Sequence, residues 1–138
     1  MRPSNWNRLI SDHMRETMKK PFERGKTDCV TFIADCVEIE TGIDPIKEGR
    51  GYESIEAGFA VMREYGCNSL ADIMDRHFKR EPQYRRLRKG DVVFRVTDTG
   101  ETLGLVWDNS KVFFRVENGG FDVTHLKRSD IGWRIDGR

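Results

Sequence analysis

The sequence predicts an α+β domain, and the main reason is a change in the period of its apolar residues. Over residues 1–78 the apolar side chains recur every three or four positions, as on one face of a helix. From Gly90 onward, short runs of β-forming residues are separated by turns that contain Gly, Asn or Asp. Helices followed by an antiparallel meander predict N-terminal helices packed on one face of a C-terminal sheet of four to five strands.

Four segments of the first half have helical spacing: residues 4–20, 27–42, 55–66 and 69–78. The second segment has the clearest ends, because Thr27 or Asp28 can cap its first turn and Gly42 can take the left-handed stop position. Its apolar residues lie on more than one side, which predicts a buried helix at the centre of the fold. Ser69 and Asp72 form the pattern of a capping box at the start of the fourth segment.

Five segments of the second half are expected to be strands: residues 91–96, 102–107, 111–116, 121–125 and 133–135. Turns are expected between them where Gly, Asn and Asp gather, over residues 97–100, 108–110 and 118–120. In the first half, two glycines flank Arg50, and such a loop can bring its backbone close to another part of the chain.

The composition is that of one globular domain spanning residues 1–138, with 37% hydrophobic and 34% charged residues. The net charge of +1 gives no general attraction to nucleic acid or to a membrane surface. No apolar run is long enough to cross a bilayer and the N-terminus does not resemble a signal peptide, so we expect a cytoplasmic protein. Three cysteines without a Cys-x-x-Cys pair predict free thiols, and no metal or other cofactor is expected.

Cys29 is the candidate nucleophile, because it lies in the first turn of the expected central helix. Unpaired N–H groups and the helix dipole favour a thiolate at that position. The alternative is a small hydrophobic residue of the core, which is the usual place of a free cysteine. We expect Cys36, two turns further on, to belong to the core, and Cys67 to lie in a loop and be partly exposed.

A thiolate nucleophile needs a base, and the three histidines are the candidates. His13 and His77 both fall on the apolar stripe of an expected helix, which favours a structural role. His125 ends the fourth expected strand and is the only histidine on the sheet. It is therefore a weak candidate for a displaced base, and a surface residue at a strand end is the favoured interpretation.

Residues 76–89 carry seven Lys or Arg residues and one acid, Glu81. An exposed basic loop with an aromatic residue can contact phosphate or an acidic partner. A solvated connector, balanced by acids elsewhere in the chain, is the favoured interpretation, so we expect no nucleic-acid partner.

The segment Asp28-Cys29-Val30-Thr31-Phe32 resembles the Asp-Cys-Ser-x-Phe motif of NlpC-type cell-wall peptidases. Gly90-Asp91-Val92-Val93-Phe94 resembles their Gly-Asp-Leu-Val-Phe strand. The chain also looks like a set of phage and prophage proteins related to that fold, through six short motifs in order: Thr27-Asp28-Cys29, Thr41-Gly42-Ile43-Asp44-Pro45, Arg50-Gly51-Tyr52, Gly90-Asp91-Val92, Leu103-Gly104-Leu105 and Trp133-Arg134.

The resemblance implies a papain-like fold in which Cys29 attacks a peptide bond of the bacterial cell wall. In that family a histidine at the start of a His-x-Gly segment is the base, and a polar residue on the next strand orients it. The matching segment here is Thr102-Leu103-Gly104-Leu105, so the base position is Thr102. The orienting position falls within residues 112–114, which are apolar. General-base help is worth about 10²–10⁴-fold in rate, so we expect peptidase activity to be lost or very low.

The resemblance therefore implies a catalytically degenerate domain that acts as a structural or assembly component of a phage virion or tail. Its expected partners are other virion proteins, with cell-wall peptide as a further possibility, and its expected location is the host cytoplasm and then the virion. Two alternatives remain open. One is an active cysteine hydrolase that uses Cys29 and His125, and the other is a nucleic-acid-contacting module that uses residues 76–89.

Overall fold

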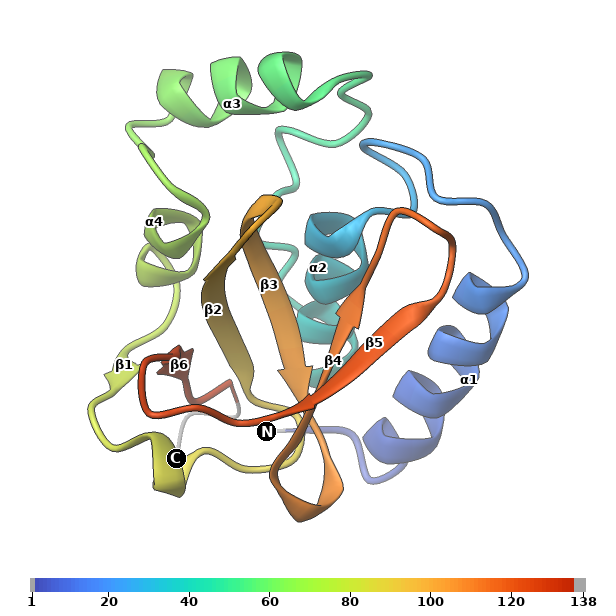
Figure 1. Cartoon of the computed structure of the whole chain (residues 1–138), viewed down its shortest axis with the longest axis vertical. Helices are drawn as coiled ribbons and strands as arrows, with labels where there is room; N and C mark the ends of the chain where they lie inside the picture. Colours follow the sequence, from blue (N-terminus) through green and yellow to red (C-terminus); the bar gives the residue numbers. More distant parts are fainter. Residues whose placement is uncertain (1, 136–138) are drawn as a thin grey trace.

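The computed structural model describes residues 2–135 and shows an α+β fold with a six-stranded antiparallel sheet in the order β1-β6-β2-β3-β4-β5 (Figure 1). The helices are α1 (Trp6–Met18), α2 (Cys29–Thr41), α3 (Ile55–Glu64) and α4 (Leu70–Asp75), with 3-10 turns η1 (Tyr84–Arg86) and η2 (Asp108–Ser110). The strands are β1 (Arg80–Glu81), β2 (Val92–Thr97), β3 (Gly100–Val106), β4 (Lys111–Arg115), β5 (Phe121–His125) and β6 (Ile131–Trp133).

The expectation of four to five strands was wrong by one strand, because β1 lies inside the basic connector. Its two residues, Arg80 and Glu81, pair with Trp133 and Gly132 of β6. Neither residue is a strong β-former, so their strand conformation comes from this pairing and not from local preference.

The central helix has the ends that the sequence predicts. Asp28 is its N-cap, and the Asp28 Oδ1 atom accepts a hydrogen bond from the backbone N–H of Thr31 at 2.9 Å. Gly42 takes the left-handed conformation at φ 79° and ends the helix. The fourth helix begins with the predicted capping box of Ser69 and Asp72, but it ends at Asp75 and does not reach residue 78.

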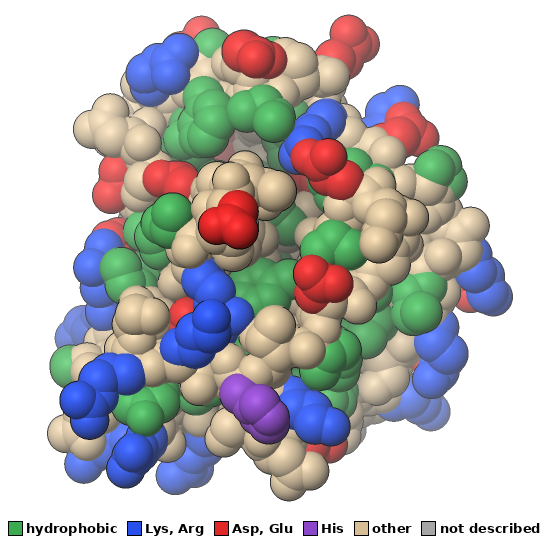
Figure 2. Space-filling model, in the orientation of Figure 1, with side chains coloured by type: hydrophobic (Ala, Val, Ile, Leu, Met, Phe, Trp, Pro, Cys, Tyr) green, Lys and Arg blue, Asp and Glu red, His purple; other side chains and the backbone are tan. Residues whose placement is uncertain are grey.

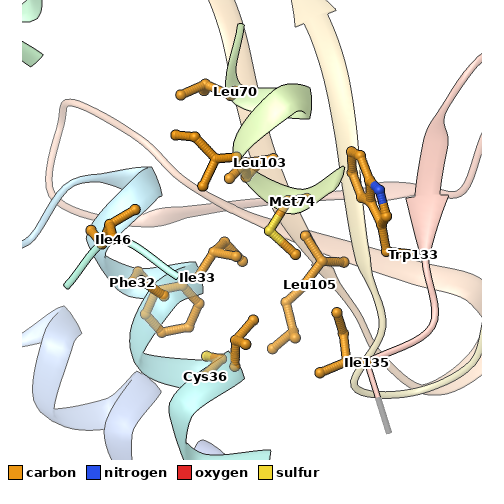
Figure 3. Close-up of a cluster of buried hydrophobic side chains, with 14 of the residues drawn as sticks. Phe32, Ile33, Cys36, Ile46, Leu70, Met74, Leu103, Leu105, Trp133 and Ile135 are labelled. Atoms are coloured by element: carbon orange, nitrogen blue, oxygen red, sulfur yellow. The ribbon is translucent and has the colours of Figure 1, made fainter. Parts of the chain in front are cut away.

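The main core lies between the helices and one face of the sheet. Helix α2 packs on β3 and β4, α1 packs against α2, and α4 packs on β3 (Figure 1). Figure 3 shows the side chains that meet there, among them Phe32, Ile33, Cys36, Ile46, Leu70, Met74, Leu103, Leu105, Trp133 and Ile135. Cys36 is fully buried, as expected.

Cys67 is also a core residue, and the expectation that it would be partly exposed was wrong. Its side chain is 1% exposed. Its backbone N–H donates to the Met62 carbonyl at 3.0 Å, so the chain turns back at the end of α3 and carries the thiol inward. This turn depends on Gly66, at φ +78°, which precedes it.

The Gly-Asp motif before β2 fixes a crowded junction. A Cβ atom on Gly90, at φ +94°, would lie 2.4 Å from Oε1 of the buried Glu40. The neighbouring Asp91 is fully buried, and its carboxylate accepts the backbone N–H of Arg88 at 2.8 Å and that of Ile135 at 3.2 Å. The motif therefore joins α2, the start of β2 and the C-terminal end of the sheet.

The other face of the sheet has its own apolar cluster, formed by Leu87, Val93, Val106, Val112 and Phe114. A buried ion pair crosses this face, in which Arg95 of β2 donates to the two Asp130 oxygens at 2.7 and 2.6 Å. Arg95 also donates to the Thr124 hydroxyl at 2.7 Å. These contacts hold β5 and the turn after it over β2, so the sheet is strongly curled.

Candidate functional site

Cys29 is the first residue of α2, and its half-buried side chain faces Thr102 of β3. The Thr102 side chain and the Leu103 backbone both act on the pKa of the thiol, and Thr102 lines the same cleft as Cys29. The structure thus brings Cys29 and Thr102 together, as the motif alignment predicts.

The surroundings of Cys29 favour the thiol over the thiolate. Burial is the largest influence and raises the pKa of Cys29, while the hydrogen bond from Thr102 opposes that rise. The negative charge of Asp28 raises the pKa further. Because the net shift is upward from an ordinary value of 9.0, Cys29 is protonated at neutral pH.

Asp28 is fully engaged in holding the start of α2. Its carboxylate is 2% exposed and accepts four hydrogen bonds. The donors are the backbone N–H of Gly25 at 2.9 Å, the N–H of Thr31 at 2.9 Å, the Thr31 hydroxyl at 3.0 Å and the Tyr52 hydroxyl. Burial and the Asp28 charge raise the pKa of Tyr52, so Tyr52 stays a donor. Asp28 is therefore a structural residue next to Cys29 and not a proton acceptor for it.

The loop with two glycines packs against this helix start, as its composition allows. The backbone N–H of Gly51 donates to the Gly25 carbonyl at 3.2 Å, and a Cβ atom on Gly25 would lie 2.1 Å from the Tyr52 carbonyl oxygen. Arg50 bridges two acids: its Nε atom lies 2.8 Å from Oδ2 of Asp44, and its Nη2 atom lies 2.8 Å from Oδ1 of Asp35. The Arg-Gly-Tyr motif thus positions α2 from one side.

Arg115 positions the same helix from the other side, and the sequence reasoning missed it. Its buried guanidinium donates to the carbonyls of Thr27 and Lys20, both at 2.9 Å, and to that of Gly119. These bonds attach the segment between α1 and α2 to β4. An arginine in the otherwise apolar run Val-Phe-Phe-Arg-Val was the one available signal, because a buried cation must have acceptors.

Residues 112–114, where the NlpC-type pattern has the residue that orients the base, are apolar. Val112 and Phe114 are buried, and the Phe114 ring fills the space over Gly104, where a Cβ atom would lie 2.5 Å from the ring. No side chain in this row can orient a base at Thr102.

His125 lies at the opposite end of the sheet from Cys29. It pairs with Lys111, whose carbonyl accepts the backbone N–H of Trp107, the residue directly after β3 and five positions beyond Thr102. At about 3.4 Å per residue this separates the Thr102 and His125 rows by about 17 Å along the strands. His125 is exposed, as the favoured interpretation of the sequence holds, and does not line the cleft at Cys29.

A cleft of about 590 Å³ opens beside Cys29, between α3 and the β2–β3 hairpin. Figure 2 shows the molecule hollowed on this face, with hydrophobic side chains above the hollow. The apolar walls include Phe22, Val30, Ile46, Ile55, Phe59 and Met62. The exposed acids Glu48, Asp98 and Asp122 stand at its edge, and Arg24 at the same edge pairs with Glu117. None of the lining residues within 2–135 is a histidine.

Comparison with known proteins gives one finding, a family model that matches residues 1–135. The chain belongs to this family. Its description is "Domain of unknown function (DUF6950)". No curated protein matches the chain.

Further features of this DUF6950 domain bear on cofactors and membranes. Among residues 2–135, no group of three or more His, Cys, Asp or Glu side chains is placed to hold a metal ion. No helix in the same range is both long and apolar enough to cross a membrane.

Proposed function

We propose that this DUF6950 domain is a catalytically degenerate, papain-like protein that binds an extended peptide segment in the cleft beside Cys29. One observation carries the proposal: the sulfur at the start of α2 faces the hydroxyl of Thr102, where the NlpC-type pattern needs a histidine. A threonine cannot take the thiol proton near neutral pH, and the raised pKa of Cys29 leaves that proton in place.

The shape of the cleft supports binding of a peptide. Its size is in the range of ligand sites, its walls are mostly apolar, and polar groups stand at its edge. The resemblance to phage and prophage proteins leads us to propose further that the bound segment belongs to another virion or tail protein. The domain would then be made in the host cytoplasm and carried in the virion as an assembly component.

The second candidate function, a cysteine hydrolase of cell-wall peptides, would need a base near Cys29. The strand register that separates His125 from Thr102 argues against His125 in that role.

A hydrolysis assay tests the loss of catalysis. The wild-type domain and Cys29→Ala are incubated with soluble peptide fragments of bacterial cell wall, and newly formed amines are measured by mass spectrometry. We expect no difference between the two proteins. Hydrolysis that depends on Cys29 would overturn the proposal and support the hydrolase.

A display experiment tests the cleft itself. Random peptides are selected on the wild-type domain, and enriched peptides are measured against Ile55→Asp, which places a charge on the apolar wall. Arg8→Asp, on the exposed surface of α1, is the control. We expect enriched apolar peptides that lose affinity for Ile55→Asp alone. No enrichment, or equal binding to all three proteins, would count against a peptide-binding cleft.

A further inference from the structure

Two segments that are distant in sequence form one strongly basic surface away from the cleft. Its members are exposed side chains from the connector around η1 and from the turn between β5 and β6: Lys79, Arg85, Arg86, Arg88, Lys127 and Arg128, here called the cationic face. Figure 2 shows Lys and Arg side chains gathered at the lower left, where β1 and η1 lie in Figure 1.

The acids near this surface are already engaged. Asp75 pairs with Arg80 at 2.8 Å, and Glu81 pairs with Arg134 at 3.2 Å. Within residues 2–135, none of the six side chains of the cationic face forms an ion pair with an acid. On α1 the cations are arranged differently, since Arg15 pairs with Asp12 and Lys19 pairs with Glu16.

Tyr84 lies where the two segments meet. Arg85 donates from Nε to the Tyr84 hydroxyl at 3.1 Å, and its guanidinium lies 5.5 Å from the centre of the ring. That hydrogen bond, together with the charges of Arg85 and Arg128, lowers the pKa of Tyr84. Tyr84 and Leu126, which lies in the turn after β5, both pack against the apolar cluster of Leu87 and Phe114, so the two basic segments meet on this side of the sheet.

The placement of the charges distinguishes this surface from an ordinary solvated one. The whole chain carries a net charge of only +1, so the cationic face reflects segregation and not a general excess. Six unpaired cations in one region repel one another, and a polyanion would relieve that repulsion. The six exposed cations come from two separate segments and form an extended surface (Figure 2), which fits a repeating phosphate backbone.

We propose that the cationic face binds single-stranded nucleic acid, with its Arg and Lys side chains on the phosphates and Tyr84 stacked on a base. A stacking contact needs an unpaired base, which is why a single strand fits better than a duplex. The proposal is independent of the function proposed for the cleft, because the cationic face and the cleft have no residue in common.

Fluorescence anisotropy with a labelled oligothymidylate tests the proposal on the full chain. We expect binding at low salt that weakens as salt rises, with a slope of log K against log salt of about −0.7 per phosphate contacted. The variant with Arg85→Glu, Arg86→Glu and Arg128→Glu should lose binding. Its charge-matched control, with Arg8→Glu and Arg15→Glu on α1 and Lys19→Glu at its C-cap, should keep binding.

Three further measurements can overturn the proposal. Tyr84→Ala should weaken binding about tenfold, in the range measured for loss of one base–aromatic stack. An unchanged affinity would contradict the stacking contact. Equal affinity for a duplex of the same length would contradict the preference for single strands. Equal competition by polyglutamate at the same charge would show an acidic-polymer site, and absence of binding at low salt would end the idea. Circular dichroism melting confirms that each variant is folded.

Discussion

At the scale of single residues, Cys29 lies in the first turn of a helix, but its other surroundings do not favour a thiolate. Cys29 has the helix start, but burial and Asp28 outweigh the hydrogen bond from Thr102 and raise its pKa. The carboxylate of the neighbouring Asp28 accepts hydrogen bonds from Gly25, Thr31 and Tyr52. The residues around the thiol thus hold the start of α2 in place and do not activate the sulfur.

This role of Asp28 gives a stability prediction. Asp28→Ala removes the N-cap of α2 and leaves the half-buried Tyr52 hydroxyl without its acceptor. We expect a loss of about 2–4 kcal/mol in the free energy of unfolding, from a lost cap and an unsatisfied, half-buried donor together. Urea unfolding measures it. Asp12→Ala, an exposed residue of α1, is the matched control, and an equal effect of both substitutions would contradict the assigned role.

At the scale of elements, α2 is fixed from two sides while α3 stands apart. Arg115 and the loop of Arg50 to Tyr52 hold the start of α2. In α3 only Met62 is buried, and Ile55 is 46% exposed at its first turn. Helix α3, which forms one wall of the cleft, is therefore less firmly attached to the core than α2.

Hydrogen exchange should detect this difference. The amides of α3 should exchange faster than those of α2, because few buried apolar contacts oppose local opening of α3. A peptide selected for the cleft should slow exchange in α3 and leave α1 unchanged. Equal protection of α2 and α3 in the free protein would show that α3 is part of the rigid core.

The junction of α4 with β6 should weaken in acid. Asp75 accepts hydrogen bonds from Arg80 and from the indole N–H of Trp133, and these, with Arg80 the larger cause, lower the pKa of Asp75 below its ordinary value of 3.8. A lowered pKa stabilises the folded state above the unfolded value, and this stability is lost as the pH falls through the folded pKa.

We therefore expect Asp75→Asn to reduce the free energy of unfolding near neutral pH by less than about 1 kcal/mol, since the pair is partly exposed. The difference from wild type should shrink in acid, where the carboxylate is protonated in both states. Thermal melts across the pH range measure it. A difference that stays constant with pH would mean that the ionised carboxylate is not what stabilises the junction.

At the scale of the whole molecule, the sequence predicts the order of the four helices and of the strands from β2 onward, because both ends of α2 and the start of α4 have their own local signals. Asp28 and Gly42 are capping residues, and both take the expected places. The sequence also singles out Cys29 and Thr102, and both line the same cleft. What the sequence could not predict depends on tertiary contacts: the two-residue β1, the inward turn of Cys67, and the three carbonyls that Arg115 joins.

The cationic face is a further feature that the sequence alone could not predict. The run of basic residues 76–89 is visible in the sequence, but the placement of Lys127 and Arg128 beside it is a product of the folded sheet. The two basic segments meet only in the folded chain, where Tyr84 and Leu126 pack against one apolar cluster.

The most direct test of the central claim measures the alkylation rate of Cys29 against pH in the wild type and in Thr102→His. Cys29→Ser provides the background from the two buried thiols, Cys36 and Cys67. The account predicts that wild-type Cys29 reacts slowly at neutral pH and accelerates only above pH 9.0, its ordinary pKa, and that Thr102→His moves the acceleration to lower pH. Rapid alkylation of wild-type Cys29 at neutral pH, or a folded Thr102→His protein with an unchanged profile, would contradict it.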